Sequence, residues 1–186
     1  MTALAILTVI AVVAFFTVGD ESSGDRERYD TAADYLYDLS QAIVGNEPTR
    51  GQTSFRWVIG VYPGKLSDLT TPITTGGTNI CGAAYTNPGN TGKWTEPFWK
   101  KVLTTTGTVL ASGFTAQDAL VRLTAVPTPG FNQAGTFAIR LPSVTLTDAQ
   151  GLDAAVDDAV SGTAGTVRYA ATDPTTVDYY VMISGC

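Results

Sequence analysis

The chain has 186 residues, of which 44% are hydrophobic and 15% are charged, so it can hold one anchor and one globular domain but hardly two domains with separate cores. Its net charge of −6 leaves no basic surface to pair with phosphates, so nucleic acid and anionic lipid headgroups are poor partners. The sequence contains no histidine, the commonest general base near neutral pH and the commonest metal ligand, so we do not expect an enzyme.

The first predicted element is an apolar anchor helix over residues 1–19. Residues 3–18 (ALAILTVIAVVAFFTV) carry no charge, and as a helix they span roughly 24 Å, just enough to cross a membrane. The basic n-region and the cleavage site of a secretory signal are missing, so we expect this helix to be retained in lipid. The missing basic n-region suggests that a short leader was removed before Met1, and an ordinary initiator Met is the alternative. The residues expected to pack against neighbouring helices are Leu4, Ile6, Leu7, Ile10 and Val13.

The second predicted element is an amphipathic helix within residues 20–47. Residues 19–24 (GDESSG) interrupt the apolar run and predict a break or a kink. From Asp25 to Val44 the apolar or small residues recur at helical spacing, with charged residues mostly between them. Gly45, Asn46 and Pro48 predict the end of the helix.

Residues 48–186 predict a β-rich globular domain outside the cytoplasm. Gly, Thr and Pro punctuate runs of β-branched and aromatic residues, as in antiparallel sheets. The predicted strands are 55–62, 109–114, 119–125, 136–141, 166–170 and 177–183. One helix is predicted over residues 148–160, with Thr147 as its N-cap. The predicted fold class is therefore α+β, with a long N-terminal helix packed on an antiparallel sheet.

Cys81 and Cys186 are the two cysteines of the chain, and their spacing fits neither a redox pair nor a zinc site. A disulfide is the preferred interpretation, and two unpaired core thiols are the alternative. A bridge would stabilise the fold by up to about 4.7 kcal/mol in the chain-entropy model. It would also place the domain in an oxidising compartment, such as the periplasm or the cell surface.

This order of elements resembles type IV pilins and the pseudopilins of type II secretion systems. Residues 61–69 (VYPGKLSDL) are similar to the "YP..L..L" segment of pseudopilins, and residues 94–101 (WTEPFWKK) are similar to their "W.GPY" segment, with Glu96 where the family has Gly. The resemblance implies an anchor helix that continues into a helix packed on a sheet, and a disulfide that closes the C-terminal region. It implies a structural subunit that needs no cofactor and contacts other membrane or filament subunits. Ala5 stands where that family usually carries a glutamate that takes part in assembly.

The clustered carboxylates are interpreted as structural. Asp148, Asp153, Asp157 and Asp158 predict a solvated helix face. Asp173 and Asp178 bracket a Pro-Thr-Thr loop that is either an ordinary capped turn or part of a calcium site, because carboxylate oxygens suit Ca²⁺. No Ser-x-x-Lys pair occurs, and the Gly-rich stretches at 76–77 and 162–165 lack the Lys of a phosphate-binding loop. No catalytic, metal or cofactor residue is therefore assigned.

The aromatic residues Trp94, Phe98 and Trp99 lie among Lys93, Lys100 and Lys101. They predict either a core plug under a long loop or a contact patch. The patch would bind a neighbouring protein, since Trp is prominent in binding hot spots, or the membrane interface, where Trp also concentrates.

Two hypotheses for the function follow. The first is a non-enzymatic, pilin-like structural subunit of the bacterial inner membrane, with its domain in the periplasm or outside the cell. The second is a single-span accessory subunit that braces a larger respiratory or photosynthetic membrane complex, for which Ala5 is expected because pilin docking is not needed. An envelope hydrolase or a sugar-binding module is disfavoured by the missing histidine and the lack of a paired-carboxylate motif.

Overall fold

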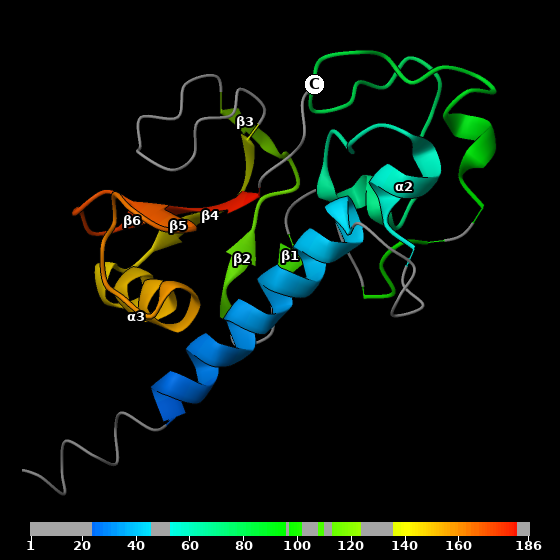
Figure 1. Ribbon diagram of the computed structural model, residues 1–186. Coiled ribbons are helices and arrows are strands. Elements are labelled where there is room, and N and C mark those ends of the chain that lie inside the picture. Colours follow the sequence, from blue (N-terminus) through cyan, green and yellow to red (C-terminus); the bar gives the residue numbers. More distant parts are fainter. Residues whose placement is uncertain are drawn as a thin grey trace, which may run out of the picture.

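The computed structural model describes residues 24–45, 53–95, 97–101, 108–109, 113–123 and 136–181. Over these residues the protein has an α+β fold with a four-stranded antiparallel sheet (Figure 1). The first helix covers residues 24–44 and is called the N-terminal helix below. The α+β class, a helix at 24–44 and the antiparallel sheet agree with the prediction from the sequence. The predicted anchor, residues 1–19, lies outside the described residues, and within them no helix is long and apolar enough to cross a membrane.

The N-terminal helix is amphipathic, as its sequence predicts. Ala32, Leu36, Leu39 and Ile43 are each 0% exposed, and they follow one another at intervals of three or four residues, which places them on one helix face. Aspartates on the opposite side, among them Asp30 and Asp34, are exposed. Full burial of a Leu or Ile side chain contributes about 1.5–3 kcal/mol, so this stripe holds the helix on the domain.

The four-stranded sheet has the order β3-β4-β6-β5, with strands Val121–Leu123, Thr136–Val144, Thr175–Val181 and Val167–Tyr169 in that spatial order. The predicted strands at 119–125, 136–141, 166–170 and 177–183 overlap these four. In β6 buried residues alternate with more exposed ones, because successive side chains point to opposite faces of a sheet. Val177, Tyr179 and Val181 lie on the buried face, and Ile139 of β4 is the cross-strand partner of Tyr179.

The strand predicted at 109–114 is wrong as a single element. The structure instead has two short paired strands, β1 (Thr108–Val109) and β2 (Thr115–Ala116). Gly113 lies just before β2 with φ of 89°, a conformation that glycine adopts without a Cβ clash and that does not continue a strand.

The strand predicted at 55–62 is also wrong, because residues Phe55–Ile59 form the short helix α2. The Ser54 hydroxyl caps this helix by accepting a hydrogen bond from the Trp57 amide, and Gly60 ends it with φ of 89°. Phe55 and Ile59 are four residues apart and both are buried, so they share the inner face of α2. The 3₁₀ turns η2 (Leu66–Leu69) and η3 (Thr91–Lys93) follow. They lie in residues 60–95 and 97–101, called the loop-rich region below.

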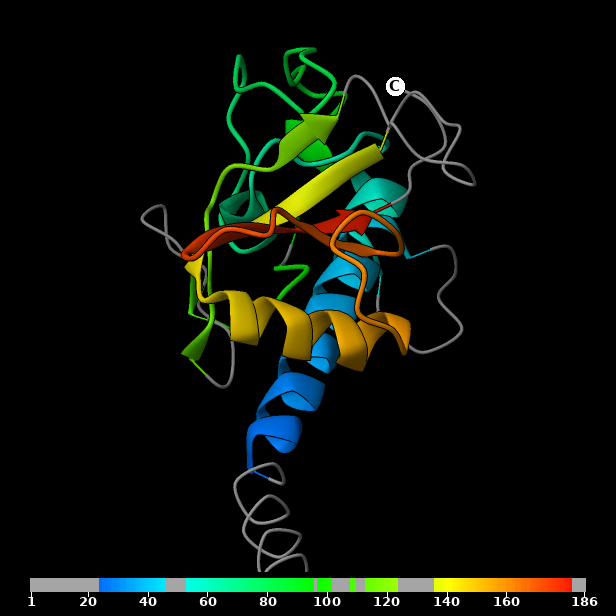
Figure 2. The ribbon, with the colours of Figure 1, turned by 90° about the vertical axis from the view of Figure 1, so that its left-hand side faces the viewer.

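The predicted helix at 148–160 is present as α3, but it covers Leu146–Asp157. Its N-cap is Thr145 and not Thr147, because the Thr145 side chain accepts a hydrogen bond of 3.1 Å from the Asp148 amide. Figure 2 shows α3 running along the sheet and crossing the N-terminal helix. At this crossing a Cβ on Gly151 would collide with the Tyr29 ring, so the glycine allows the two helices to approach closely.

We predict that Leu36→Ala lowers the free energy of unfolding by about 2–5 kcal/mol, because it leaves a cavity between the N-terminal helix and the domain. Urea unfolding of the full chain in detergent, followed by tryptophan fluorescence, measures this loss. The neighbouring exposed Tyr37→Ala is the matched control and should change stability by less than about 0.5 kcal/mol. Equal losses in the two variants would contradict the assigned helix face.

Candidate functional site

The acidic residues of α3 connect the parts of the domain. Asp148 forms an ion pair with Arg28 and accepts a hydrogen bond of 3.0 Å from the Tyr29 hydroxyl. The Arg28 guanidinium also lies 5.1 Å from the Tyr29 ring centre and 5.3 Å from that of Phe114, distances typical of cation–π contacts. Asp148 therefore fastens α3 to the first turns of the N-terminal helix.

Asp153 lies inside the protein, with 0% exposure. Its Oδ2 accepts hydrogen bonds from the Ser161 amide (2.6 Å) and the Tyr169 hydroxyl (3.2 Å). Burial raises the pKa of the Asp153 carboxyl, the hydrogen bonds from Ser161 and Tyr169 oppose this shift, and Asp157 one turn away adds to it. Burial also raises the pKa of Tyr169 to about 12, with the Asp153 charge as the second cause.

Asp157 covers the outer edge of β5. Its carboxylate accepts hydrogen bonds from the amides of Thr166 (2.8 Å) and Val167 (2.9 Å). The amide of Tyr169 donates to the Gly162 carbonyl at 3.0 Å. The prediction of a solvated acidic face on this helix is thus wrong for Asp148, Asp153 and Asp157, while Asp158 is exposed. The error arose because the N-terminal helix covers Asp148 and the loop after α3 folds back onto Asp153 and Asp157.

The outer face of the sheet carries a row of charged residues. Asp178 of β6 is the cross-strand partner of both Arg140 and Arg168, and its carboxylate pairs with Arg140 through bonds of 2.7 and 2.8 Å. Arg168 donates to the carbonyls of Gly165 and Thr163, and its guanidinium lies 5.1 Å from the Tyr180 ring centre. The row lines an open hollow of about 600 Å³, in which the carboxylate offsets part of the positive charge.

The calcium alternative for the C-terminal loop gains no support from this geometry. Asp178 is engaged by Arg140, and Asp173 Oδ1 accepts a hydrogen bond of 3.3 Å from the Leu146 amide at the start of α3. The two carboxylates thus serve different protein partners, which favours the capped turn. In the described part of the chain no group of three potential metal-ligating acids or thiols comes together.

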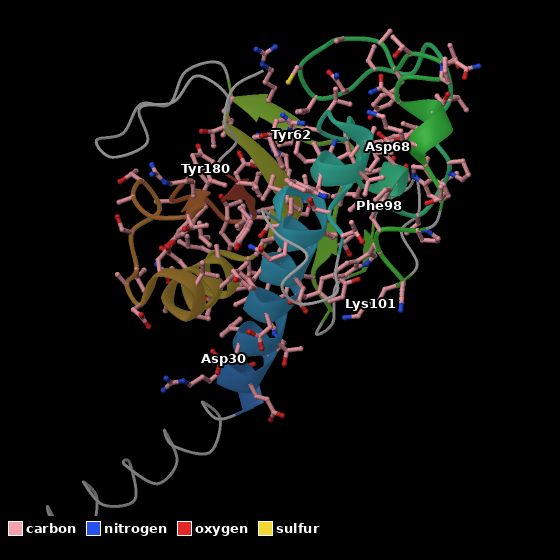
Figure 3. The ribbon with its side chains drawn as sticks, turned by 45° about the vertical axis from the view of Figure 1, so that its right-hand side comes forward. Asp30, Tyr62, Asp68, Phe98, Lys101 and Tyr180 are labelled. Atoms are coloured by element: carbon pink, nitrogen blue, oxygen red, sulfur yellow. The ribbon has the colours of Figure 1, made fainter. Side chains whose placement is uncertain are left out.

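The "YP..L..L" segment folds around a second buried carboxylate, Asp68. Asp68 Oδ2 accepts hydrogen bonds from the Tyr85 hydroxyl (2.8 Å) and from the amides of Gly64 (2.9 Å) and Lys65 (3.3 Å). Burial raises the pKa of Asp68, although these bonds oppose the shift, and burial together with the Asp68 charge raises the pKa of Tyr85. Leu66 and Leu69 are fully buried beside it. The segment therefore anchors the loop-rich region to the core (Figure 3).

The aromatic residues expected at 94–99 lie mostly inside the protein. Trp99 is 5% exposed and packs edge-on against Tyr35 of the N-terminal helix, with ring centres 5.3 Å apart. Phe98 packs edge-on against Phe55 at 5.2 Å, and the Trp94 indole donates to the Asp68 carbonyl at 3.2 Å. This arrangement favours the core plug for Trp99 over a contact patch. A role of Trp94 and Phe98, which are partly buried, in a subunit contact stays a prediction.

Other predicted site residues lie outside the described part of the chain. They are the helix-packing residues Leu4, Ile6, Leu7, Ile10 and Val13, and also Cys186. Cys81 is partly buried, and its amide donates to Asn79 Oδ1 at 2.9 Å. No cysteine in the described residues is free, but the pairing of Cys81 with Cys186 stays a prediction.

The exposed aromatic residues Tyr37 and Trp57 were missed by the sequence analysis. Tyr37 is 51% exposed on the N-terminal helix, and Trp57 is 64% exposed on α2. Treating 55–62 as a strand hid Trp57. Helical spacing would have revealed it, because Phe55 and Ile59 define a buried face and Trp57 lies midway between them on the opposite side.

Comparisons with known proteins do not assign the chain to a family: no family model matches it, and no curated protein or solved structure does either.

We predict that Trp99→Ala lowers the free energy of unfolding by about 3–5 kcal/mol, because a buried indole is lost. Trp57→Ala removes the same side chain from an exposed position and is the matched control, with an expected change below about 0.5 kcal/mol. Thermal and urea unfolding of the full chain measure both. A Trp99→Ala protein as stable as the control would overturn the assignment of Trp99 to the core.

We predict that Asp153→Asn becomes more stabilising, relative to the wild type, as the pH rises. The pKa of the Asp153 carboxyl is higher in the folded protein than its value of about 3.9 in the unfolded chain. The protonated carboxyl therefore stabilises the fold fully below the unfolded pKa, and this stabilisation is lost as the pH rises through the folded pKa. Asn keeps an oxygen for the Ser161 amide but never ionises. Urea unfolding between pH 3.5 and 7.5 tests this, with exposed Asp158→Asn as the control. A stability difference that does not change with pH would contradict the prediction.

Proposed function

We propose that this chain is a non-enzymatic, pilin-like structural subunit, held by residues 1–19 in the bacterial inner membrane and presenting its domain outside the cytoplasm to other protein subunits. The observation that supports this most is the continuity of one segment. The apolar run of residues 3–18 leads, after a short polar stretch, into a helix whose apolar stripe is buried on the domain.

The attachment of this helix to the domain suits such a role. Arg28 and Tyr29, in the first turns of the described helix, bond to Asp148 of α3. Leu36, Leu39 and Ile43 are buried further along, and Tyr35 packs against Trp99. The helix is thus fixed to the domain at several points along its described length, which suits an element that joins a domain to an anchor.

The titratable groups support a structural role over a catalytic one. Asp68 and Asp153 have raised pKa values, but each is buried, and Oδ2 of each carboxylate accepts hydrogen bonds from the backbone and from a tyrosine hydroxyl. A general base must lie within hydrogen-bond reach of a substrate proton. The carboxylate that lines the open hollow, Asp178, is instead paired with Arg140.

The experiment follows the full chain by mass spectrometry in two fractions: filaments sheared from intact cells, and gently solubilised membranes run on a native gel. The proposal expects the chain in the filaments. If the chain migrates with one fixed membrane complex and is absent from the filaments, the filament role is rejected and the accessory subunit is supported. Ala5 is expected in such an accessory subunit, because pilin docking is not needed there.

A pair of anchor variants controls this experiment. Ile10→Asp places a charge at the centre of the apolar run, at a cost of about 2.5–3.5 kcal/mol for membrane insertion, and should remove the chain from both fractions. Ile10→Leu keeps the run apolar and should behave as the wild type. Unchanged recovery of Ile10→Asp would mean that residues 3–18 do not anchor the protein.

A further inference from the structure

Exposed apolar side chains are rare on the described surface. The large ones are Tyr37 (51%), Trp57 (64%) and Val160 (56%). Single exposed apolar residues are common in proteins and need no explanation. Tyr37 and Trp57 differ from Val160 because several charges of one sign lie around each. Those around Tyr37 are aspartates, and those around Trp57 are Arg56 and Lys93.

The first of these surfaces is the acidic patch, defined as Tyr37 with Asp30, Asp34 and Asp38. The three aspartates are exposed and recur every fourth residue of the N-terminal helix, so they form one stripe, and Tyr37 lies beside it, three residues after Asp34. The ion pairs of the described chain, Arg28–Asp148 and Arg140–Asp178, do not involve them. Like charges at this spacing repel one another, so the patch gains stability when a cation approaches.

The second surface is the basic patch, defined as Trp57 with Arg56 and Lys93. Lys93 belongs to η3, which packs against α2. Its ammonium group lies close to Gly60 at the end of α2, where a Cβ added to the glycine would be 3.8 Å from Lys93 Nζ. Asn90 Nδ2 fastens the start of η3 to the Ile59 carbonyl at 3.1 Å. Arg56 lies 5.1 Å from the Tyr62 ring centre and donates to the Gly60 carbonyl. The scaffold under Trp57 is therefore fixed.

We propose that the basic patch of one copy of this chain docks on the acidic patch of a second copy, with Trp57 set against Tyr37 and with Lys93 and Arg56 facing Asp34 and Asp38. This inference deepens the proposed structural role and rests on it. Charge complementarity selects the occupant. Two copies that each carry a net charge of −6 repel one another overall, so the contact depends on the local complementarity of the two patches. The stripe beside Tyr37 supplies both the opposite charge and an aromatic counterpart to Trp57.

The way in which copies can join depends on where the two patches lie on the domain. Figure 3 places Asp30 near the start of the described N-terminal helix and Asp68 and Phe98 beside α2, at the other end of the domain. When a copy docks through one patch only, its other patch stays available for a further copy, and the contact is heterologous. Repetition of such a contact builds a closed ring or an open row of copies.

The test uses two full-length copies with different tags, co-expressed in the same membrane, solubilised gently and purified through one tag. Trp57→Ala in both copies should lower the recovery of the second copy by about tenfold or more, as expected for a tryptophan at the centre of a contact. Val160→Ala, an equally simple truncation of an exposed apolar residue, should leave it unchanged. Unfolding midpoints of all variants should match the wild type, because the changed side chains are exposed.

Charge reversal identifies the partner patch. Lys93→Glu and Asp34→Lys should each lower recovery several-fold, and a chain carrying both changes should recover toward the wild-type value, because the contact between positions 93 and 34 then has its charges exchanged. A rescued double variant also shows that the single variants had not simply misfolded.

Three results would overturn the proposal: wild-type copies that do not co-purify, Trp57→Ala that binds as the wild type does, or a double variant no better than its parents.

The filament fraction is scored separately. Copies that associate through these patches but are absent from sheared filaments keep the contact and reject the filament role. Filaments that are insensitive to every patch variant reject the contact and keep the filament role.

Discussion

The burial of one face of the N-terminal helix is the interaction on which the rest of the structure depends. Leu36, Leu39 and Ile43 are inaccessible to solvent, and each of the other units contacts this helix or a unit that does. Asp148 joins α3 to its first turns, Trp99 joins the loop-rich region to Tyr35, and the sheet covers α3 from the other side. Without the helix, the buried side of this small domain would face water.

The sequence predicted the parts of the fold that follow from periodicity. The helix at 24–44 and the strand β6 have regular patterns of burial, so their residues could be assigned from spacing alone. Strand β4 is buried at most positions, and its β-branched and aromatic residues indicated it instead. The helix α2 failed the same test, because five residues hold little periodicity and the β-branched and aromatic composition of FRWVI resembles a strand. There the Ser54 cap and Gly60 decide the structure, and both lie outside the apolar run.

The candidate site was harder to predict, because its chemistry depends on chain segments that meet only in the folded protein. Asp153 and Asp157 have the helical spacing of a solvated face, and nothing in α3 itself indicates that Ser161, Thr166 and Tyr169 return to them. Asp68 is similar, since its partner Tyr85 is 17 residues away. The carboxylates of this acidic protein therefore divide into two groups, one that organises loops inside the domain and one that stays on the surface.

The cap on β5 has a consequence for how the protein can associate. An edge strand normally offers a row of unpaired amides and carbonyls, which invites another chain to add a strand. Here β5 is an edge of the sheet, but its outward amides are occupied by the Asp157 carboxylate and the Gly162 carbonyl. On this side, growth of the sheet into amyloid-like or strand-exchanged assemblies is blocked. Association at this edge is left to side chains, whose contacts are selective and reversible.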